Sequence, residues 1–346
     1  MSLFDKFQPI VDIRAELEKL GVMPFGAITE KILSPTEAIV NGHKVILAGT
    51  NNYLGLTFDP SCVAAARNAI ESQGTGTTGS RMANGSFSAH AALEQELAGF
   101  YQVDHGMVFS TGYAANLGTL VALLKPGDAV LLDADAHASL YDGCLMSGAD
   151  IYRFRHNDVA SLEKRLERLG ARAQDCLIVT EGLYSVLGDC APLVDIVALR
   201  NKYGAMLLVD EAHSLGVYGD TGCGVAEAQG VMDQVDFFVG TFSKSLGAMG
   251  GFCVSQHPEL DLIRYVSRPF IFTASSSPSI IASTHEALKQ LKSRPELRES
   301  LWRNATRLYQ GFNDLGFETG PEISPVVAIK LGAKEVALPF WNQLLE

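Results

Sequence analysis

The sequence predicts an α/β fold in which a mostly parallel β-sheet is wrapped by helices, with a smaller α/β region towards the C-terminus. Three observations predict this fold. Between residues 106 and 239, short apolar runs alternate with longer stretches of helical periodicity, which is the rhythm of βαβ units. The runs are continuously apolar, as strands buried on both faces of a parallel sheet are. Polar residues and glycines gather directly after the runs, where an open α/β sheet binds its ligands.

The elements follow in chain order. The N-terminal region carries an amphipathic helix over 9–21, a hairpin of strands 38–40 and 44–47 around the turn Asn41-Gly42, and a helix over 62–73. Strands are expected at 106–110, 129–132, 151–154, 177–180, 205–209 and 235–239, with helices at 88–101, 113–124, 138–146, 159–169 and 193–203. Helices at 278–291, 295–315 and 338–345 and one strand at 326–331 complete the chain. We therefore predict an N-terminal helix and hairpin over 1–50, a large domain over 51–272 and a C-terminal small domain over 273–346, which looks incomplete.

Composition narrows the class of protein. Of the 346 residues, 47% are hydrophobic and 19% charged, which is typical of a globular protein with a substantial core. The formal net charge of −12 argues against a nucleic-acid partner. The sequence starts without a signal peptide and has no run of 18 apolar residues, so no transmembrane segment is predicted. Six cysteines without CxxC spacing indicate reduced thiols, and we expect a cytoplasmic protein without a metal site.

The stretch 205–251 carries the predicted chemistry. Asp210 follows one apolar strand and Lys244 follows the next, so both side chains are expected at the same edge of the sheet. A lysine that forms a Schiff base needs a partly desolvated pocket that lowers its pKa. An aspartate can pair with a pyridinium nitrogen, and the hydroxyls of Thr241 and Ser243 can bind a phosphate. Although an isolated loop lysine is usually just a solvated charge, this combination predicts pyridoxal 5′-phosphate (PLP).

Two other motifs point elsewhere and are rejected. Residues 210–213 spell DEAH, as in a family of helicases, but the chain has no Gly-Lys pair and so no phosphate-binding Walker A loop. Residues 74–79 match GxGxxG, the dinucleotide fingerprint, which must follow a strand. Here the preceding segment, 62–73, is predicted to be a helix, so the dinucleotide interpretation fails on context.

Further candidates lie after other predicted strands. Gly112 and Tyr113 open a helix directly after a strand, which makes an anion site for a phosphate. His137 could stack on a flat ring, and Ser185 and His213 could hydrogen-bond a phenolic oxygen. Each has an ordinary alternative, such as a strand-to-helix turn for Gly112 or a satisfied core histidine for His137. Their common position at strand ends favours the joint interpretation.

The motifs resemble a known family. Residues 241–245 (TFSKS), 209–213 (VDEAH), 135–139 (DAHAS) and 111–116 (TGYAAN) are similar to those of the α-oxoamine synthases, fold type I PLP enzymes with the architecture of aspartate aminotransferase. Within the family, residues 79–85 (GSRMANG) and 153–157 (RFRHN) look like the bacterial serine palmitoyltransferases. Two departures from the family pattern, Ala136 for serine and Ser276-Ser277-Pro278 for L-P-P, bear on the choice of substrate.

The resemblance implies a role for each candidate. Lys244 would bind PLP covalently and later move protons, and Asp210 would pair with the ring nitrogen. His137 would stack on the ring and orient the substrate carboxylate, and Ser185 and His213 would bind the phenolic oxygen. Gly112, Tyr113, Thr241 and Ser243 would hold the phosphate, Thr273 would reach the phosphate of a partner subunit, and Asn52 and Arg81 would line the substrate entrance.

The resemblance also implies an activity. The expected reaction condenses L-serine with a long-chain acyl-CoA such as palmitoyl-CoA, with loss of CO₂ and CoA, to give 3-oxosphinganine. A synthase of the same family that uses glycine or alanine, such as glycine C-acetyltransferase or 8-amino-7-oxononanoate synthase, is the alternative. A silent PLP-binding subunit is disfavoured because Lys244 is present. We expect a homodimer with shared active sites, at most a transient contact with a membrane surface, and a carboxylate-binding arginine beyond Glu346.

Overall fold

The computed structural model describes residues 2–21 and 25–345. It divides into two compact units. One consists of Met1–Thr50, Tyr309–Gly320 and Ala328–Glu346, and the other of Asn51–Leu308 and Pro321–Val327. The domain boundaries expected from the sequence, 1–50, 51–272 and 273–346, stay a prediction.

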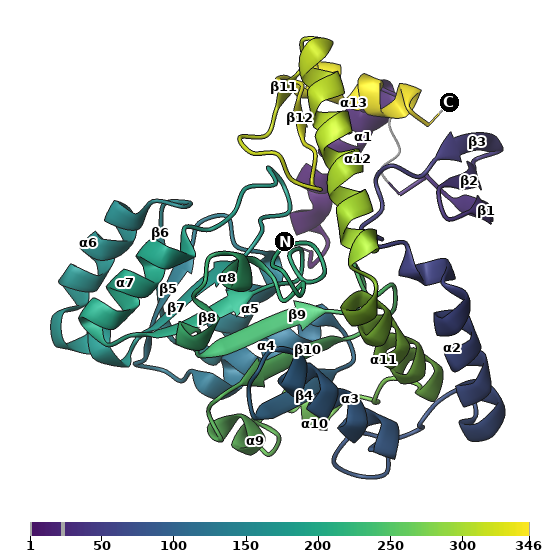
Figure 1. The fold of residues 1–346 in the computed structure, drawn as a ribbon. Helices are drawn as coiled ribbons and strands as arrows, with labels where there is room; N and C mark the ends of the chain where they lie inside the picture. The colour runs from purple at the N-terminus through teal and green to yellow at the C-terminus, as the bar shows by residue number, and fades with distance from the viewer. Residues whose placement is uncertain (1, 22–24, 346) are drawn as a thin grey trace. The chain divides into compact units, whose positions relative to one another are not determined.

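The larger unit contains a seven-stranded sheet of order β4-β10-β9-β8-β7-β5-β6 (Figure 1). Its strands are β4 (His105–Phe109), β5 (Ala129–Asp133), β6 (Asp150–Phe154), β7 (Leu177–Glu181), β8 (Met206–Asp210), β9 (Phe237–Thr241) and β10 (Gly251–Ser255). Every strand predicted for this region is present, within two residues at each end. The prediction of a mostly parallel sheet is confirmed, because six of the seven strands run in one direction and β10 runs in the other.

Strand β10 was not predicted from the sequence. It follows β9 after only residues 242–250, and a connection of that length cannot make the long crossover that a parallel neighbour needs. The chain therefore turns back, and Gly251 pairs with both Thr241 of β9 and Phe109 of β4. The return loop places Lys244 at the end of β9, between two paired strands.

Alternating side chains of the central strands enter different halves of the core. On β8, Leu207 and Val209 belong to one hydrophobic cluster and Leu208 to the other. On β9, Phe238 belongs to the first of these clusters and Val239 to the second. This is the two-residue period of a strand with both faces covered, and it explains why the runs are apolar throughout.

Helices surround this sheet, as expected. They are α2 (Pro60–Gln73), α3 (Ser88–Phe100), α4 (Gly112–Leu123), α5 (Ala138–Ser147), α6 (Val159–Leu169), α7 (Leu193–Tyr203) and α11 (Pro278–Ser293), and the unpredicted short α8 (Val225–Ala228), α9 (Glu259–Ile263) and α10 (Arg268–Ile271). The predicted long helix is α12 (Pro295–Asp314), which the two units share, with Leu308 in the larger and Tyr309 in the smaller. The segment 74–79 follows helix α2, which confirms that its glycines are not a dinucleotide fingerprint. Short 3₁₀ turns are η1 (Asp5–Phe7), η2 (Leu56–Phe58), η3 (Gly170–Asp175) and η4 (Met232–Gln234).

The smaller unit confirms the predicted hairpin. Strands β2 (Glu37–Val40) and β3 (His43–Ile46) pair around Asn41 and Gly42, whose φ angles of 49° and 80° are those of a two-residue hairpin turn. The unit also contains α1 (Gln8–Lys19), β1 (Thr29–Ser34), β11 (Glu318–Thr319), β12 (Ile329–Lys330) and α13 (Lys334–Gln343). The predicted strand 326–331 is reduced to β12, and the helix expected over 338–345 begins earlier, at Lys334. None of the helices in the described ranges has the length and apolar character required to cross a bilayer.

Candidate active site

A cavity of about 280 Å³ opens at the carboxyl ends of the central strands. It brings together most of the residues singled out in the sequence: Gly112, Tyr113, His137, Asp210, His213, Thr241, Ser243 and Lys244. These residues come from the ends of β5, β8 and β9 and from the start of α4. The carboxyl ends of parallel strands meet at one edge of a sheet, and this topology accounts for their convergence.

Lys244 is a half-buried amine with acidic neighbours. Burial lowers its pKa, while the charges of Asp210 and Glu181 act in the opposite direction. Among the described residues, no carboxylate oxygen lies within 4.0 Å of its ammonium nitrogen. The amine is therefore near acids without being fixed by any of them, which suits a lysine that must exist partly as a free nucleophile.

Asp210 is oriented by two hydrogen bonds. Asn116 Nδ2 donates to its Oδ2 at 2.7 Å, and the backbone N–H of Ala212 donates to its Oδ1 at 2.8 Å. Asn116 also donates to Ser139 Oγ at 2.9 Å, which ties helix α4 to helix α5 beneath the cavity. The sequence analysis missed Asn116, although it lies one helical turn after Gly112 and so on the same face of α4.

Glu181 is a second acid that the sequence analysis did not select. It ends β7, pairs in register with Asp210 of β8, and lines the cavity. Its Oε1 accepts a hydrogen bond from the backbone N–H of His137 at 2.6 Å. Burial, followed by the nearby charge of Asp210, raises its pKa well above the usual range for a glutamate. The signal for it was available, since it directly follows the apolar run 177–180.

The two histidines of the cavity are held differently. His137 caps helix α5, and its Nδ1 lies 2.7 Å from Ser139 Oγ. His213 Nδ1 lies 2.8 Å from the hydroxyl of Tyr53. Burial, together with the charges of Lys244 and His137, lowers the pKa of His213 to about 3. The His213 ring is therefore neutral at physiological pH and available for a hydrogen bond in the cavity.

One end of the cavity is suited to an anion. Helix α4 begins there, and the first-turn N–H groups of a helix attract negative charge. Thr241 Oγ1 lies 2.9 Å from Ser243 Oγ, so two hydroxyls stand beside that helix start. A Cβ atom on Gly112 would come within 2.8 Å of the Thr241 side chain, so only glycine lets α4 approach β9 this closely.

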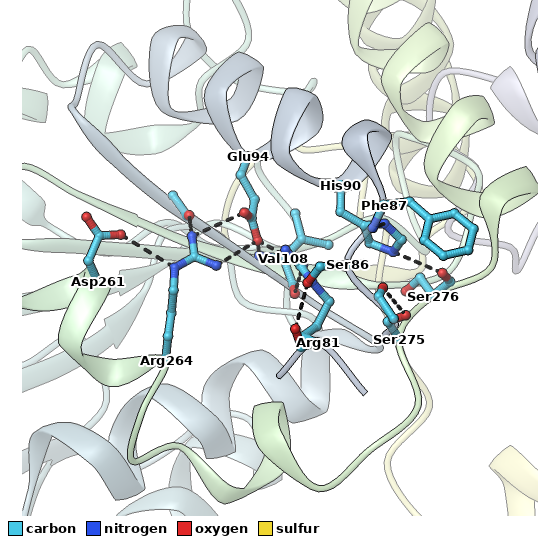
Figure 2. A network of polar contacts seen from close by, with 12 residues as sticks. Arg81, Ser86, Phe87, His90, Glu94, Val108, Asp261, Arg264, Ser275 and Ser276 are labelled. Atoms are coloured by element: carbon cyan, nitrogen blue, oxygen red, sulfur yellow. Dashed lines mark hydrogen bonds and ion pairs between the residues drawn. The ribbon is translucent and has the colours of Figure 1, made fainter. Parts of the chain in front are cut away.

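Four predicted residues do not line this cavity: Asn52, Arg81, Ser185 and Thr273. Thr273 and Arg81 instead border a much smaller pocket. Figure 2 shows that the Arg81 guanidinium points to Glu94, whose Oε1 it meets at 2.9 Å, and that Arg264 approaches the same carboxylate. With only 7% of its side chain exposed, Arg81 is engaged in a buried ion pair. The functions proposed for these four residues stay predictions.

Comparison with known proteins identifies relatives over almost the whole chain. The model of the family "aminotransferase class I and II" matches residues 43–346. A serine palmitoyltransferase from Caulobacter vibrioides is 54% identical over 346 residues, which are all of this chain and 86% of that protein. An 8-amino-7-oxononanoate synthase from Lysinibacillus sphaericus is more distant, at 38% identity over 90% of this chain and 80% of its own.

The solved structures agree with the sequence relatives. A high-resolution structure of SPT with PLP internal aldimine matches with a TM-score of 0.96 and 48% identity, over 100% of this chain and 87% of that one. The predicted fold type I architecture and the predicted resemblance are thereby confirmed. The chain belongs to the aminotransferase class I and II family, and it is similar over its full length to bacterial serine palmitoyltransferases.

Proposed function

We propose that this chain catalyses the PLP-dependent condensation of L-serine with a long-chain acyl-CoA such as palmitoyl-CoA, with release of CoA and CO₂ and formation of 3-oxosphinganine. One observation carries the proposal. Lys244 and Asp210, from the ends of adjacent strands, line one cavity in a chain that is 54% identical to a serine palmitoyltransferase. Lys244 has a lowered pKa, and two hydrogen bonds fix the Asp210 carboxylate in the same cavity.

The residues present fit PLP. The start of helix α4 with Thr241 and Ser243 offers N–H and hydroxyl donors to a phosphate, and Gly112 leaves room for its approach. At the other end, Asp210 presents an oriented carboxylate that can hold a ring nitrogen in its protonated form. Bound PLP would supply an electron sink for the negative charge that develops at the serine Cα.

The roles of the chain's own groups follow from their positions. Lys244 Nζ would bind the cofactor, take the proton from the serine Cα and return it after CO₂ has left. Its lowered pKa supports this role because a general base must be partly deprotonated near neutral pH. His137, fixed at the start of α5, would lie against the cofactor ring. Neutral His213 and Ser185 would both hydrogen-bond the phenolic oxygen of the cofactor.

The choice of amino acid can be tested directly. The purified protein with PLP and palmitoyl-CoA is offered L-serine, glycine or L-alanine, and thiol release is measured together with the mass of the product. We expect L-serine to give the highest kcat/KM and a product of the mass of 3-oxosphinganine. A higher kcat/KM for glycine or alanine would favour the alternative, a synthase of the kind found at 38% identity.

We also propose that the active form is a cytoplasmic homodimer in which Thr273 reaches the partner's phosphate site. Exposed apolar side chains close to Thr273 support an interface, since Tyr265 and Phe272 are 79% and 73% exposed in the described chain. Mixing Lys244→Ala with Thr273→Ala protein should restore part of the activity, because one of the two sites in a mixed dimer would be intact. No restoration, or an active monomer in sedimentation, would contradict the shared site. Contact with a membrane surface is proposed to be transient, so the protein should not float with lipid vesicles at physiological salt.

A further inference from the structure

A histidine outside the cavity joins the end of β5 to the loop that follows β7. His156 lies between β6 and α6, with Nδ1 at 2.9 Å from Asp133 Oδ1 and Nε2 at 2.8 Å from Asp189 Oδ2. Both carboxylates are well buried, with 1% and 11% of their side chains exposed. We call this arrangement of Asp133, His156 and Asp189 the histidine bridge.

His156 carries a fixed positive charge within the bridge. Carboxylates only accept hydrogen bonds, so both ring nitrogens of His156 must donate, which makes the ring an imidazolium. The hydrogen bonds that His156 donates to Asp133 and Asp189 raise its pKa to about 10, in spite of partial burial. Although burial acts to raise the pKa of Asp189, its hydrogen bond with His156 keeps that pKa below the usual value. At neutral pH, one cation is therefore held between two anions.

One end of the bridge anchors the turn that carries His137. Asp133 Oδ1 also accepts the backbone N–H of Asp135 at 2.9 Å, and the Asp133 carbonyl accepts that of Ala136 at 3.2 Å. His137 follows immediately as the cap of α5. The Asp133 carboxylate thus holds the strand-to-helix turn in one conformation, and His156 holds that carboxylate.

The other end of the bridge braces the loop that carries Ser185. The Tyr184 N–H donates to the Asp189 carbonyl at 2.9 Å, which closes a turn around Ser185. The His156 ring packs edge-on against the Tyr184 ring, with centroids 4.4 Å apart. Asn157 Nδ2 adds a second hydrogen bond to Asp189 Oδ2 at 2.8 Å. The loop therefore contacts the His156 segment through both Tyr184 and Asp189.

We propose that His156 is a positioning residue of the active site, which sets the His137 turn and the Ser185 loop relative to each other through the histidine bridge. The inference rests on the proposed function only in that His137 and Ser185 are taken to contact the cofactor. His156 itself does not line the cavity, so its effect must pass through Asp133 and Asp189. Asp133 is the last residue of β5 and Asp189 lies on the loop after β7, so both lie at the edge of the sheet where the cavity residues are found.

Two substitutions separate the ends of the bridge. In His156→Asn, the amide nitrogen can replace Nδ1 and keep the bond to Asp133, whereas in His156→Gln it can replace Nε2 and keep the bond to Asp189. Each variant loses one charge-assisted bond and the positive charge. The matched control is His257→Gln, which removes a histidine from Asp236 (Nε2 to Oδ1, 2.9 Å) at the start of β9, outside the cavity lining.

The readouts do not depend on the acyl donor. Hydrogen–deuterium exchange is measured on peptides covering 133–141 and 181–191, together with PLP affinity and the visible circular dichroism of the bound cofactor. We expect His156→Gln to speed exchange mainly in 133–141 and His156→Asn mainly in 181–191. PLP affinity should fall about 10- to 100-fold in His156→Gln, as for loss of a hydrogen bond to a charged group, and should fall less in His156→Asn. His257→Gln should change neither the exchange rates of the two peptides nor the visible dichroism.

Two results would overturn the inference. Equal exchange changes in both peptides for both variants would show general loosening, and unchanged dichroism and PLP affinity in His156→Gln would show a bridge that serves stability alone. Failure of the proposed function looks different, because a protein that does not use serine would still show the peptide-specific exchange pattern.

Discussion

Replacing His156 by glutamine should remove a pH-dependent part of the stability of the protein. The folded-state pKa of His156 is about 10, against 6.5 for an unperturbed histidine, because of its hydrogen bonds with Asp133 and Asp189. A group whose pKa is higher in the folded state contributes stability that is fully present below the unfolded pKa and is lost as the pH rises through the folded one. The contribution is therefore complete below about pH 6.5 and gone above about pH 10.

Its size follows from the shift. Each pKa unit corresponds to about 1.4 kcal/mol, so a shift from 6.5 to about 10 sets an upper limit of about 5 kcal/mol. The ring keeps 19% of its surface exposed, and water screens the pairs, so we expect roughly half of that, about 2–3 kcal/mol. The free energy of unfolding of His156→Gln should thus differ most from that of the wild type near pH 6 and least near pH 10.

The measurement is urea unfolding of both proteins, freed of PLP, at several values between about pH 6 and pH 10. Circular dichroism and fluorescence must give coincident transitions, so that a single free energy of unfolding is defined. His257→Gln serves again as the control for the loss of a histidine that is paired with an aspartate. A stability difference that stays constant across this range, or that grows with pH, would refute the idea that the bridge holds an imidazolium.

Three further predictions concern the cavity. Lys244→Ala should abolish turnover and the visible absorbance of covalently bound PLP, with an unchanged far-ultraviolet dichroism spectrum; a coloured, active variant would refute the assignment. Asp210→Asn should lower PLP affinity about 10- to 100-fold, because a neutral amide loses a charge-assisted bond and must turn its NH₂ group towards one of two donors, Asn116 Nδ2 or the Ala212 N–H. An affinity within error of the wild type would count against that pairing. Glu181→Gln keeps an oxygen that accepts from the His137 N–H but cannot ionise. The pKa of the wild-type carboxyl is raised, so it gains its negative charge at alkaline pH, and this charge should weaken the binding of the anionic cofactor. The PLP affinity of the variant should therefore fall less steeply at alkaline pH than that of the wild type. Identical pH profiles of PLP affinity would exclude Glu181 as the group whose ionisation weakens PLP binding.

Much of the cavity could be predicted because it follows from local patterns. Each apolar run becomes a strand, and the residue after it must lie at the edge of the sheet, which was enough to bring Asp210, His137 and Lys244 together. Glu181 obeys the same rule, but it lies in none of the family-like motifs and was not predicted. Strand β10 was missed because its sequence is short and opens with glycines, which usually mark a loop.

The remaining features depend on contacts that no local pattern encodes. Arg81 finds Glu94 13 positions away and shares it with Arg264, 170 positions from that glutamate, so its burial in an ion pair could not be read from its neighbours. His156 was noticed only as part of a family-like stretch, RFRHN. Its partners Asp133 and Asp189 lie 23 and 33 positions away, at the end of β5 and on the loop after β7. Pairing of this kind is decided by tertiary structure rather than by sequence spacing.

The cavity and the histidine bridge use the same components with opposite results. Each places one cation near two acids that end or follow neighbouring strands: Lys244 with Asp210 and Glu181, and His156 with Asp133 and Asp189. The imidazolium is held at 2.8 and 2.9 Å on both sides, so its charge is stabilised and its pKa rises. Lys244 has no carboxylate within 4.0 Å among the described residues, so desolvation outweighs attraction and its pKa falls. Direct hydrogen bonds to carboxylates, or burial without them, therefore separate a charge that positions loops from an amine that can give and take a proton. A variant that drew an acid to within hydrogen-bonding distance of Lys244 should lose reactivity even though every catalytic group remained.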